Sequence, residues 1–208
     1  GSDFKVEAEF NDATISTDGN YIFVRLFWGH DIDIIRNSSG KLQKGSRISV
    51  GGSVLGIPAM SEDGKFLYVP DQIGGVVRIY SNKNDVFDEQ GAAPLKVGGA
   101  TEVVINRDGT QLIVATYRES YSIQKNNGFT EENIRKIINV NHLHNYRFSM
   151  DEKYAFAFGY TDGVTVLNAG TRNTYSFLTN IKNVPSLVAA KKIFELLPEK
   201  PQYMPVPS

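Results

Sequence analysis

Two short motifs bring together side chains that could perform chemistry. His142 and His144 are one residue apart, so on a strand both imidazoles lie on one face. With a third ligand they could bind a metal, and His30 is the obvious supplement. Asp31 and Asp33 share this spacing, and paired carboxylates can do acid–base work when their pKa values differ. The simpler interpretations are loop histidines and a solvated strand start, so we predict no metal and no cofactor.

Other catalytic signatures are missing from the sequence. The chain has no cysteine, which excludes disulfides, thiolate catalysis and cysteine-ligated zinc. It also lacks a calcium-binding Asp-x-Asp-x-Asp-Gly loop, a Gly-x-Ser-x-Gly nucleophile motif, a P-loop and a dinucleotide-binding glycine motif. We therefore predict no catalytic residues, and the sequence favours a non-enzymatic role.

Charge and hydropathy exclude several kinds of partner. The formal net charge is −1, and no long run of lysine and arginine occurs. A nucleic-acid-binding domain is normally basic, so we expect no nucleic-acid partner. No apolar run approaches the length of a membrane span, and we expect no membrane association. None of this constrains the cellular compartment.

A nine-residue segment built around an Asp-Gly turn occurs four times. The turn aspartates are 45, 45 and 43 residues apart, a period typical of propeller blades. The turn residues are Asp18-Gly19, Asp63-Gly64, Asp108-Gly109 and Asp151-Glu152. A residue that recurs in every unit serves the unit, so we interpret these aspartates as structural.

The chemistry of the turn explains these residue types. Serine, asparagine and aspartate side chains hydrogen-bond the backbone nearby, and glycine adopts a positive φ without a Cβ clash. Asp-Gly between apolar strands predicts a hairpin. Glu152 replaces glycine in the fourth copy, where we expect a different or strained turn. Two short glycine pairs, Gly51-Gly52 and Gly98-Gly99, are expected to link repeats.

Each repeat also contains β-rich segments, which predict an all-β propeller of about four four-stranded blades. The pattern Ser-x-Asp-Gly-x-x-Leu-apolar-Val with a second hairpin resembles the WD40-like family and the TolB- and YVTN-type bacterial propellers over residues 10–180. The Trp-Asp and Gly-His dipeptides that are usual in WD40 repeats are missing. The segment Trp28-Gly29-His30-Asp31 contains the same residue types, but in a different order and in a different strand and loop. The resemblance implies the fold and says little about function.

The predicted organisation has three parts. Residues 1–8 are a tag remnant and leader, residues 9–180 are the blades (9–50, 51–99, 100–140 and 141–180), and residues 181–208 are an amphipathic helix and proline-rich tail. Polar insertions are expected at residues 82–94 and 126–132, with one helical turn over residues 131–135. In repeat proteins such insertions often mark the binding face.

Two sets of residues are candidates for binding a partner. The tail helix should place Leu187, Phe194 and Leu197 on one face, which either caps the propeller or docks on another chain. Aromatic residues at strand ends, with His30 beside them, form either a recognition surface or packing between blades. They are Trp28, Tyr117, Tyr121, Tyr146 and Tyr160.

Four blades of this kind raise the question of ring closure. Such repeats usually belong to rings of six to eight blades, and an open edge invites pairing with another chain. We rank an incomplete or partner-completed ring above closure of the four units alone. The predicted function is a non-catalytic scaffold for protein interaction or self-association; the alternative is an extracytoplasmic lactonase-like propeller that acts as an enzyme or binds a ligand.

Overall fold

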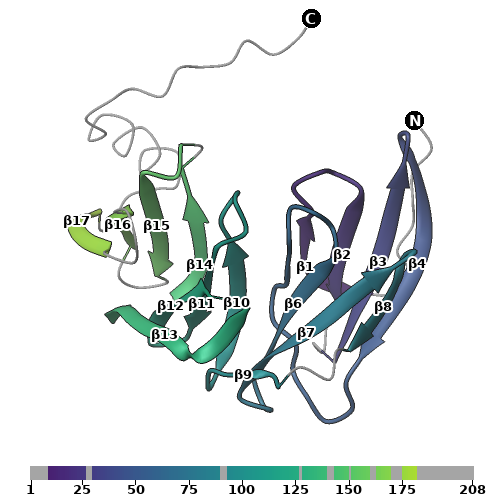
Figure 1. Cartoon of the computed structure of the whole chain (residues 1–208), viewed down its shortest axis with the longest axis horizontal. Helices are drawn as coiled ribbons and strands as arrows, with labels where there is room; N and C mark the ends of the chain where they lie inside the picture. The colour runs from purple at the N-terminus through teal and green to yellow at the C-terminus, as the bar shows by residue number, and fades with distance from the viewer. Residues whose placement is uncertain are drawn as a thin grey trace, which may run out of the picture.

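The computed structural model of the chain describes residues 9–26, 30–89, 93–126, 128–139, 143–149, 151–159, 163–169 and 175–181. These residues form four small antiparallel sheets in a propeller arrangement, one per sequence repeat (Figure 1). The predicted all-β fold is therefore confirmed at this level. The predicted helix, with Leu187, Phe194 and Leu197, lies outside the described residues.

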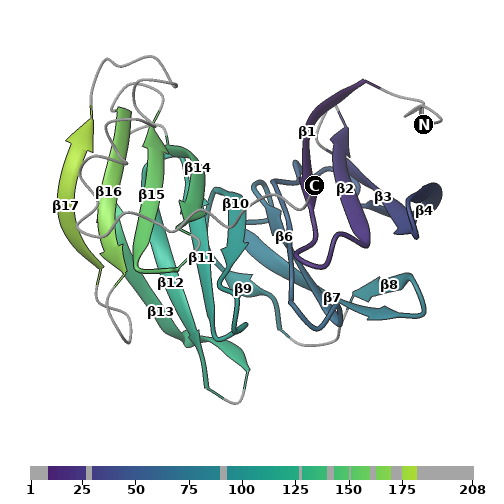
Figure 2. The same ribbon diagram turned by 90° about the horizontal axis from the view of Figure 1, so that it is seen from above.

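Each sheet is built from strands that are consecutive in the chain. The first sheet has the order β1-β2-β3-β4. Its strands are β1 (Phe10–Ile15), β2 (Tyr21–Leu26), β3 (Asp31–Ser38) and β4 (Lys41–Ser49). In the first, third and fourth sheets, the first strand lies toward the middle of the molecule and the last lies on the outer side (Figure 2).

The second sheet differs from the prediction at residues 82–94. Its strands are β5 (Ala59–Met60), β6 (Phe66–Asp71), β7 (Val76–Lys83), β8 (Val86–Glu89) and β9 (Leu95–Lys96). The segment expected to be a polar loop contains the strand β8, and β9 pairs with β7 beside it. Asn84 and Asp85 have φ values of 54° and 68°, and two adjacent positive φ values make a tight hairpin turn.

The third sheet corrects a second prediction. Its strands are β10 (Ala100–Ile105), β11 (Gln111–Thr116), β12 (Glu119–Lys125) and β13 (Phe129–Asn139). The expected helical turn over residues 131–135 is wrong, because these residues belong to β13. The register of β13 against β12 shifts twice, which breaks the alternation of buried and exposed side chains and imitates a helical pattern.

The fourth sheet completes the series. Its strands are β14 (Leu143–Phe148), β15 (Tyr154–Gly159), β16 (Gly163–Ala169) and β17 (Tyr175–Ile181). Contacts join each sheet to the next along the chain, and no comparable contact between the first and fourth sheets is found among the described strands.

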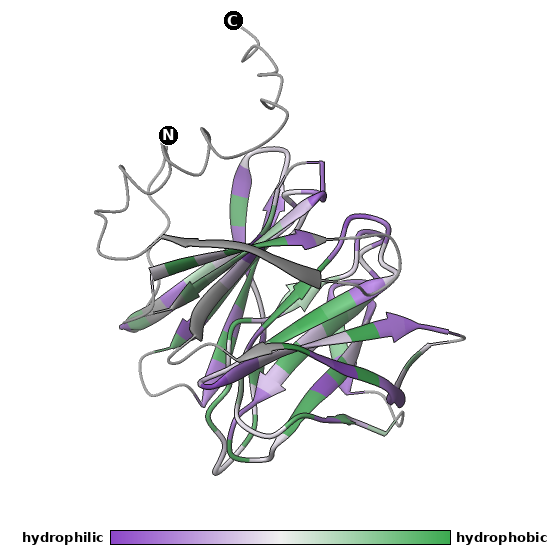
Figure 3. Cartoon of the chain, turned by 90° about the vertical axis from the view of Figure 1, so that its left-hand side faces the viewer, coloured by the Kyte–Doolittle hydropathy of each residue, from purple (hydrophilic) through white to green (hydrophobic). Residues whose placement is uncertain are grey.

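Apolar side chains fill the joints between neighbouring sheets. One cluster packs Phe23 and Ile34 of the first sheet against Leu67 and Val69 of the second. Further clusters join the second sheet to the third and the third to the fourth. Hydrophobic stretches accordingly run along the strands, and hydrophilic residues gather at many strand ends and turns (Figure 3). This burial is the main stabilising term and fixes the spacing of the blades.

The repeated turn has one hydrogen-bond pattern in all four sheets. The turn aspartate accepts from the backbone amide two residues on, with N–O distances of 3.0, 3.1, 3.0 and 3.2 Å. The residue two before it accepts from the first strand residue after the turn, at 2.9, 2.9, 2.8 and 3.0 Å. Glu152 keeps this pattern with φ at 56°, so the expected strain is present there.

Candidate functional site

One position on the inner strands differs between the repeats. It lies six residues before the turn aspartate and is occupied by Asp12, Ile57, Glu102 and Asn145 in the four units. Two of these side chains are acidic, on strands that face the middle of the molecule. The positions beside it also vary, so what singles these two residues out is a negative charge on an inner strand.

A β-bulge comes directly before this position in three of the four sheets. The register shifts between Phe10 and Asp12, between Ala100 and Glu102, and between Leu143 and Asn145. The bulged residue in the fourth sheet is His144. A bulge bends the strand and redirects the side chain that follows, and bulges are common beside active sites. The bulges therefore set the direction of the Asp12 and Glu102 side chains separately from the rest of each strand.

The bulged region also packs closely against the chain that enters the second sheet. The amide of Ile57 donates to the carbonyl of Thr101 at 2.9 Å, and the amide of Val103 donates to the carbonyl of Ile57 at 3.0 Å. A Cβ atom at Gly56 would lie 2.2 Å from the Thr101 carbonyl oxygen, so only glycine fits. This contact holds the inner strand β10 rigidly in place.

Glu102 is the most deeply buried acid on the inner strands, with 1% of its side chain exposed. One carboxylate oxygen pairs with the Arg147 guanidinium, and the other accepts from the Tyr146 amide at 2.6 Å. Both partners belong to β14, so this carboxyl group ties the third sheet to the fourth. Half of the Arg147 side chain remains exposed. The guanidinium thus has one end fixed by Glu102 and another available to solvent.

Burial raises the pKa of Glu102 to about 7. The Arg147 charge and the two hydrogen bonds oppose this rise, and the negative charge of Asp12 adds to it. Burial dominates because a charged carboxylate loses more hydration than two partners restore. A carboxyl group with this pKa changes protonation near neutral pH, a property typical of functional sites.

Asp12 contributes a second, more accessible carboxylate to this region. It pairs with Arg25 of β2 at 3.3 Å, and 47% of its side chain is exposed. Arg25 is mostly buried, and its Nε–H group has no hydrogen-bond partner among the described residues. A buried donor without an acceptor costs free energy. We define Asp12, Arg25, Glu102 and Arg147 as the inner-strand cluster.

The inner-strand cluster has the parts for reactions of a carbonyl group. The two arginines can hydrogen-bond a carbonyl or carboxylate oxygen, and the exposed carboxylate of Asp12 can accept a proton. Motifs within a single strand do not reveal this cluster, because its four residues lie on the four strands β1, β2, β10 and β14. The available signal was the comparison of equivalent positions across the repeats.

The acidic motif at the start of β3 is not a reactive pair. Arg47 binds both oxygens of Asp33, at 2.5 and 3.0 Å, and lies 3.6 Å from Asp31. Ser49 also donates to Asp31. One cation pairs with both acids, and these contacts fasten β4 to β3.

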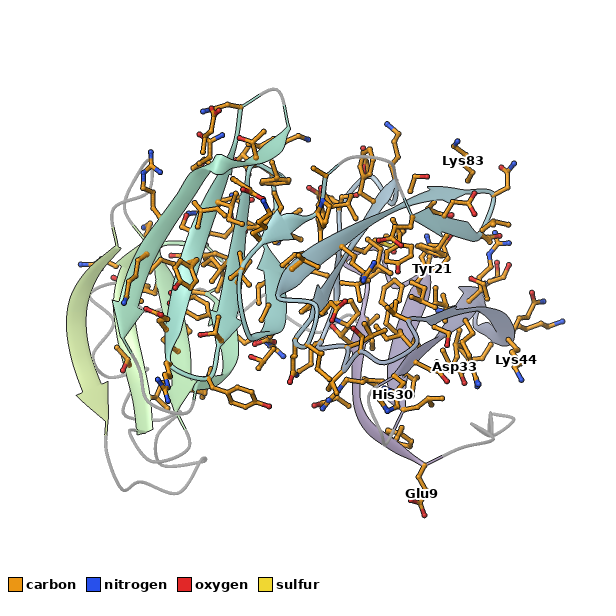
Figure 4. All side chains as sticks on the ribbon, turned by 90° about the horizontal axis from the view of Figure 1, so that it is seen from below. Glu9, Tyr21, His30, Asp33, Lys44 and Lys83 are labelled. Atoms are coloured by element: carbon orange, nitrogen blue, oxygen red, sulfur yellow. The ribbon has the colours of Figure 1, made fainter. Side chains whose placement is uncertain are left out.

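His30, the supplementary metal ligand considered from the sequence, lies directly before β3. Its Nδ1 atom contacts the carbonyl oxygen of Ser53, which holds the ring against the link to the second sheet. Figure 4 shows His30 and Asp33 on the first sheet and Tyr21 among the packed side chains. No group of metal-ligating side chains occurs within the described part of the chain. His142 lies outside that part, so the predicted pair with His144 is untested.

The aromatic candidates divide between the surface and the core. Tyr117 is 51% exposed, and its hydroxyl contacts Gln72 at 3.3 Å. Tyr121 is partly buried on β12, and Tyr146 is fully buried between the third and fourth sheets. Tyr146 therefore packs between blades and contributes its backbone amide to the site. Trp28 and Tyr160 lie outside the described residues.

Comparisons with known proteins identify the fold class. A scan against protein-family models finds no match, and a search of curated proteins finds no relative. Solved structures do match, including a protein from Lactobacillus plantarum at a TM-score of 0.65 and 16% identity. That match covers 85% of this chain and 56% of the other. The chain is thus similar to β-propeller-type proteins, and a WD40, TolB or YVTN subtype remains a prediction.

Two further matches carry names. One is a candidate 6-phosphogluconolactonase from Bacteroides fragilis, with a TM-score of 0.64, 18% identity and coverage of 83% of this chain and 55% of that one. Another is the Pseudomonas aeruginosa periplasmic gluconolactonase, with a TM-score of 0.61, 16% identity and coverage of 83% and 54%. The chain spans about half the length of these structures. No helix in the described residues is long and apolar enough to cross a membrane.

Proposed function

We propose that this chain carries a hydrolytic site for a cyclic ester of the sugar-lactone kind. The observation that supports this most directly is the inner-strand cluster, with its buried acid, its half-exposed arginine and its accessible carboxylate. Similar structures named as lactonases favour this alternative over the scaffold predicted from the sequence. A protein partner or self-association stays a prediction.

Each member of the cluster has a role in this proposal. The Arg147 guanidinium binds the ester carbonyl oxygen and stabilises the negative charge that develops on it. Glu102 is a positioning residue, since its carboxyl group holds Arg147 and is itself shielded from solvent. Asp12 accepts the proton of the attacking water, and Arg25 holds Asp12 in place.

The hydrolysis then follows in two steps. The water oxygen forms a bond to the carbonyl carbon as its proton passes to Asp12. The bond between the carbonyl carbon and the ring oxygen breaks, and the ring oxygen takes that proton from Asp12. The product is the open hydroxy acid, and Asp12 returns to its ionised form.

Acid release from δ-gluconolactone and 6-phosphogluconolactone tests this proposal. The purified chain should release acid faster than the uncatalysed reaction, and Arg147→Gln should lower kcat/KM by about 100-fold or more. Asp12→Asn should lower it similarly. Arg135→Gln is the matched control, because Arg135 is exposed on the outer strand β13 and donates to the carbonyl groups of Glu132 and Ile134. Activity no faster than the uncatalysed rate, or equal loss in Arg135→Gln, would overturn the assignment.

A further inference from the structure

A cavity of about 470 Å³ lies between the second and third sheets, away from the inner-strand cluster. Its walls are mainly apolar and include Phe66, Tyr68 and Ile79 from one sheet and Phe129 from the other. Tyr68 and Phe129 meet edge to face with ring centroids 5.4 Å apart. Ligand sites typically have this size and this predominantly apolar lining, with a few polar groups.

The charged groups at the mouth of the cavity leave one positive charge without a partner. Glu131 pairs with Lys96 at 3.7 Å, and the nearby Asp63 pairs with Lys65 at 3.3 Å. Among the residues that the structure describes, no acidic side chain pairs with Lys125, whose ammonium lies 6.0 Å from the centroid of the Phe129 ring. The mouth therefore favours a single negative charge beside the apolar walls.

Tyr68 adds a polar group that stays uncharged. Burial, together with the charge of Asp63, raises its pKa to about 12, so the hydroxyl keeps its proton and does not repel an anion. This hydroxyl makes no hydrogen bond within the described structure, and it can donate one to a ligand oxygen. The cavity thus combines apolar walls, a neutral donor and a free cation.

We infer that this cavity between the second and third blades binds a small amphipathic carboxylic acid. The apolar part of the ligand lies between Phe66, Ile79 and Phe129, and its carboxylate faces Lys125. The charge at the mouth selects the anion, and the apolar walls select against short acids such as acetate. This site is independent of the proposed hydrolysis.

Calorimetric titration with three probes tests the inference. Octanoate has both the chain and the charge, octanol has the chain alone, and acetate has the charge alone. Octanoate should bind, octanol should bind about fivefold more weakly, and acetate should give no measurable binding, because an exposed ion pair contributes up to about 1 kcal/mol. Equal affinity for octanoate and octanol, or no binding of octanoate, would overturn the inference.

Two variants place the ligand in this cavity. Lys125→Gln keeps most of the side-chain length and should weaken octanoate about fivefold without changing octanol. Ala93→Trp adds a ring at the exposed rim and should abolish binding of both probes while the circular dichroism spectrum stays unchanged. Lys41→Gln, a matched charge removal on the outer strand β4, should change neither affinity. Binding that survives in both cavity variants would show that octanoate binds elsewhere.

Discussion

The turn and the inner strand of each repeat lie only six residues apart, yet they behave differently. In all four sheets the turn aspartate accepts a hydrogen bond from the amide two residues on, with N–O distances between 3.0 and 3.2 Å. The inner position holds Asp12, Ile57, Glu102 and Asn145. Each aspartate satisfies its own turn, whereas Glu102 binds a neighbouring sheet. Repetition marks the parts that build a blade, and variation marks the parts that distinguish the blades.

The largest effect should come from removing the buried acid. Glu102→Ala leaves the Tyr146 amide and the Arg147 guanidinium without their acceptor, so the free energy of unfolding should fall by about 3 kcal/mol. Urea denaturation followed by circular dichroism measures this loss. Glu119→Ala, which removes a partly exposed, ion-paired glutamate from the same sheet, should cause a loss of less than about 1 kcal/mol. Equal effects in the two variants would erase the distinction between inner and outer positions.

A smaller effect should appear in the pH dependence of stability. The folded pKa of Glu102, about 7, lies above its ordinary value of 4.5, so the folded state holds the proton more tightly than the unfolded state. This contribution is present below pH 4.5 and is lost as the pH rises through 7. Relative to Glu102→Gln, the wild-type free energy of unfolding should therefore fall by about 2.5 kcal/mol between pH 4.5 and 7.

Denaturation of both proteins in buffers between pH 4.5 and 8 provides that comparison. The turn aspartates have the opposite shift, because their hydrogen bonds lower the pKa, as at Asp63 and Asp151. The turn aspartates are present in both the wild type and Glu102→Gln, so their effect on stability cancels when the two free energies of unfolding are subtracted. A difference that is flat or rises with pH would show that Arg147 keeps Glu102 ionised in the folded state.

The smallest effect should come from the irregular turn. Glu152 has a φ of 56°, which costs a non-glycine residue about 1 kcal/mol. Glu152→Gly removes this strain but also loses the bond from the Arg107 amide to the Glu152 carboxylate, so we expect a net stabilisation of about 0.5 kcal/mol. Thermal unfolding measures it, and Asp108→Asn serves as a turn variant without the φ change. A loss of hydrolytic activity in Glu152→Gly would contradict a purely structural turn.

Local patterns predicted most of the strands but failed where pairing is long-range. The strands beside the Asp-Gly turns lie at the expected places because the turn and its flanking apolar residues act within a few positions. Residues 131–135 were assigned to a helical turn, yet they pair with β12. That pairing depends on a neighbouring strand and on bulges, neither of which a local pattern contains. The Asn84-Asp85 turn was missed because its polar residues resemble a loop.

The candidate site shows the same limit. The close spacing of Asp31 and Asp33 in the sequence suggests a reactive pair, but Arg47 forms ion pairs with both of them. Glu102 and Arg147 are 45 residues apart and meet only because β10 and β14 pack side by side. Comparing equivalent positions in the repeats could have singled out Glu102, since an acid on a buried inner strand needs a partner.

The sequence by itself determined the repeat, because each Asp-Gly turn and its flanking strands are stabilised by bonds within one unit. It therefore also determined the number of units and the β-propeller class. The tertiary structure decided which of the varied inner residues meet, which acid is buried, and where a cavity opens between the second and third sheets. Those outcomes depend on how separate units pack against one another, and burial and charge pairing between units exist only in the folded chain.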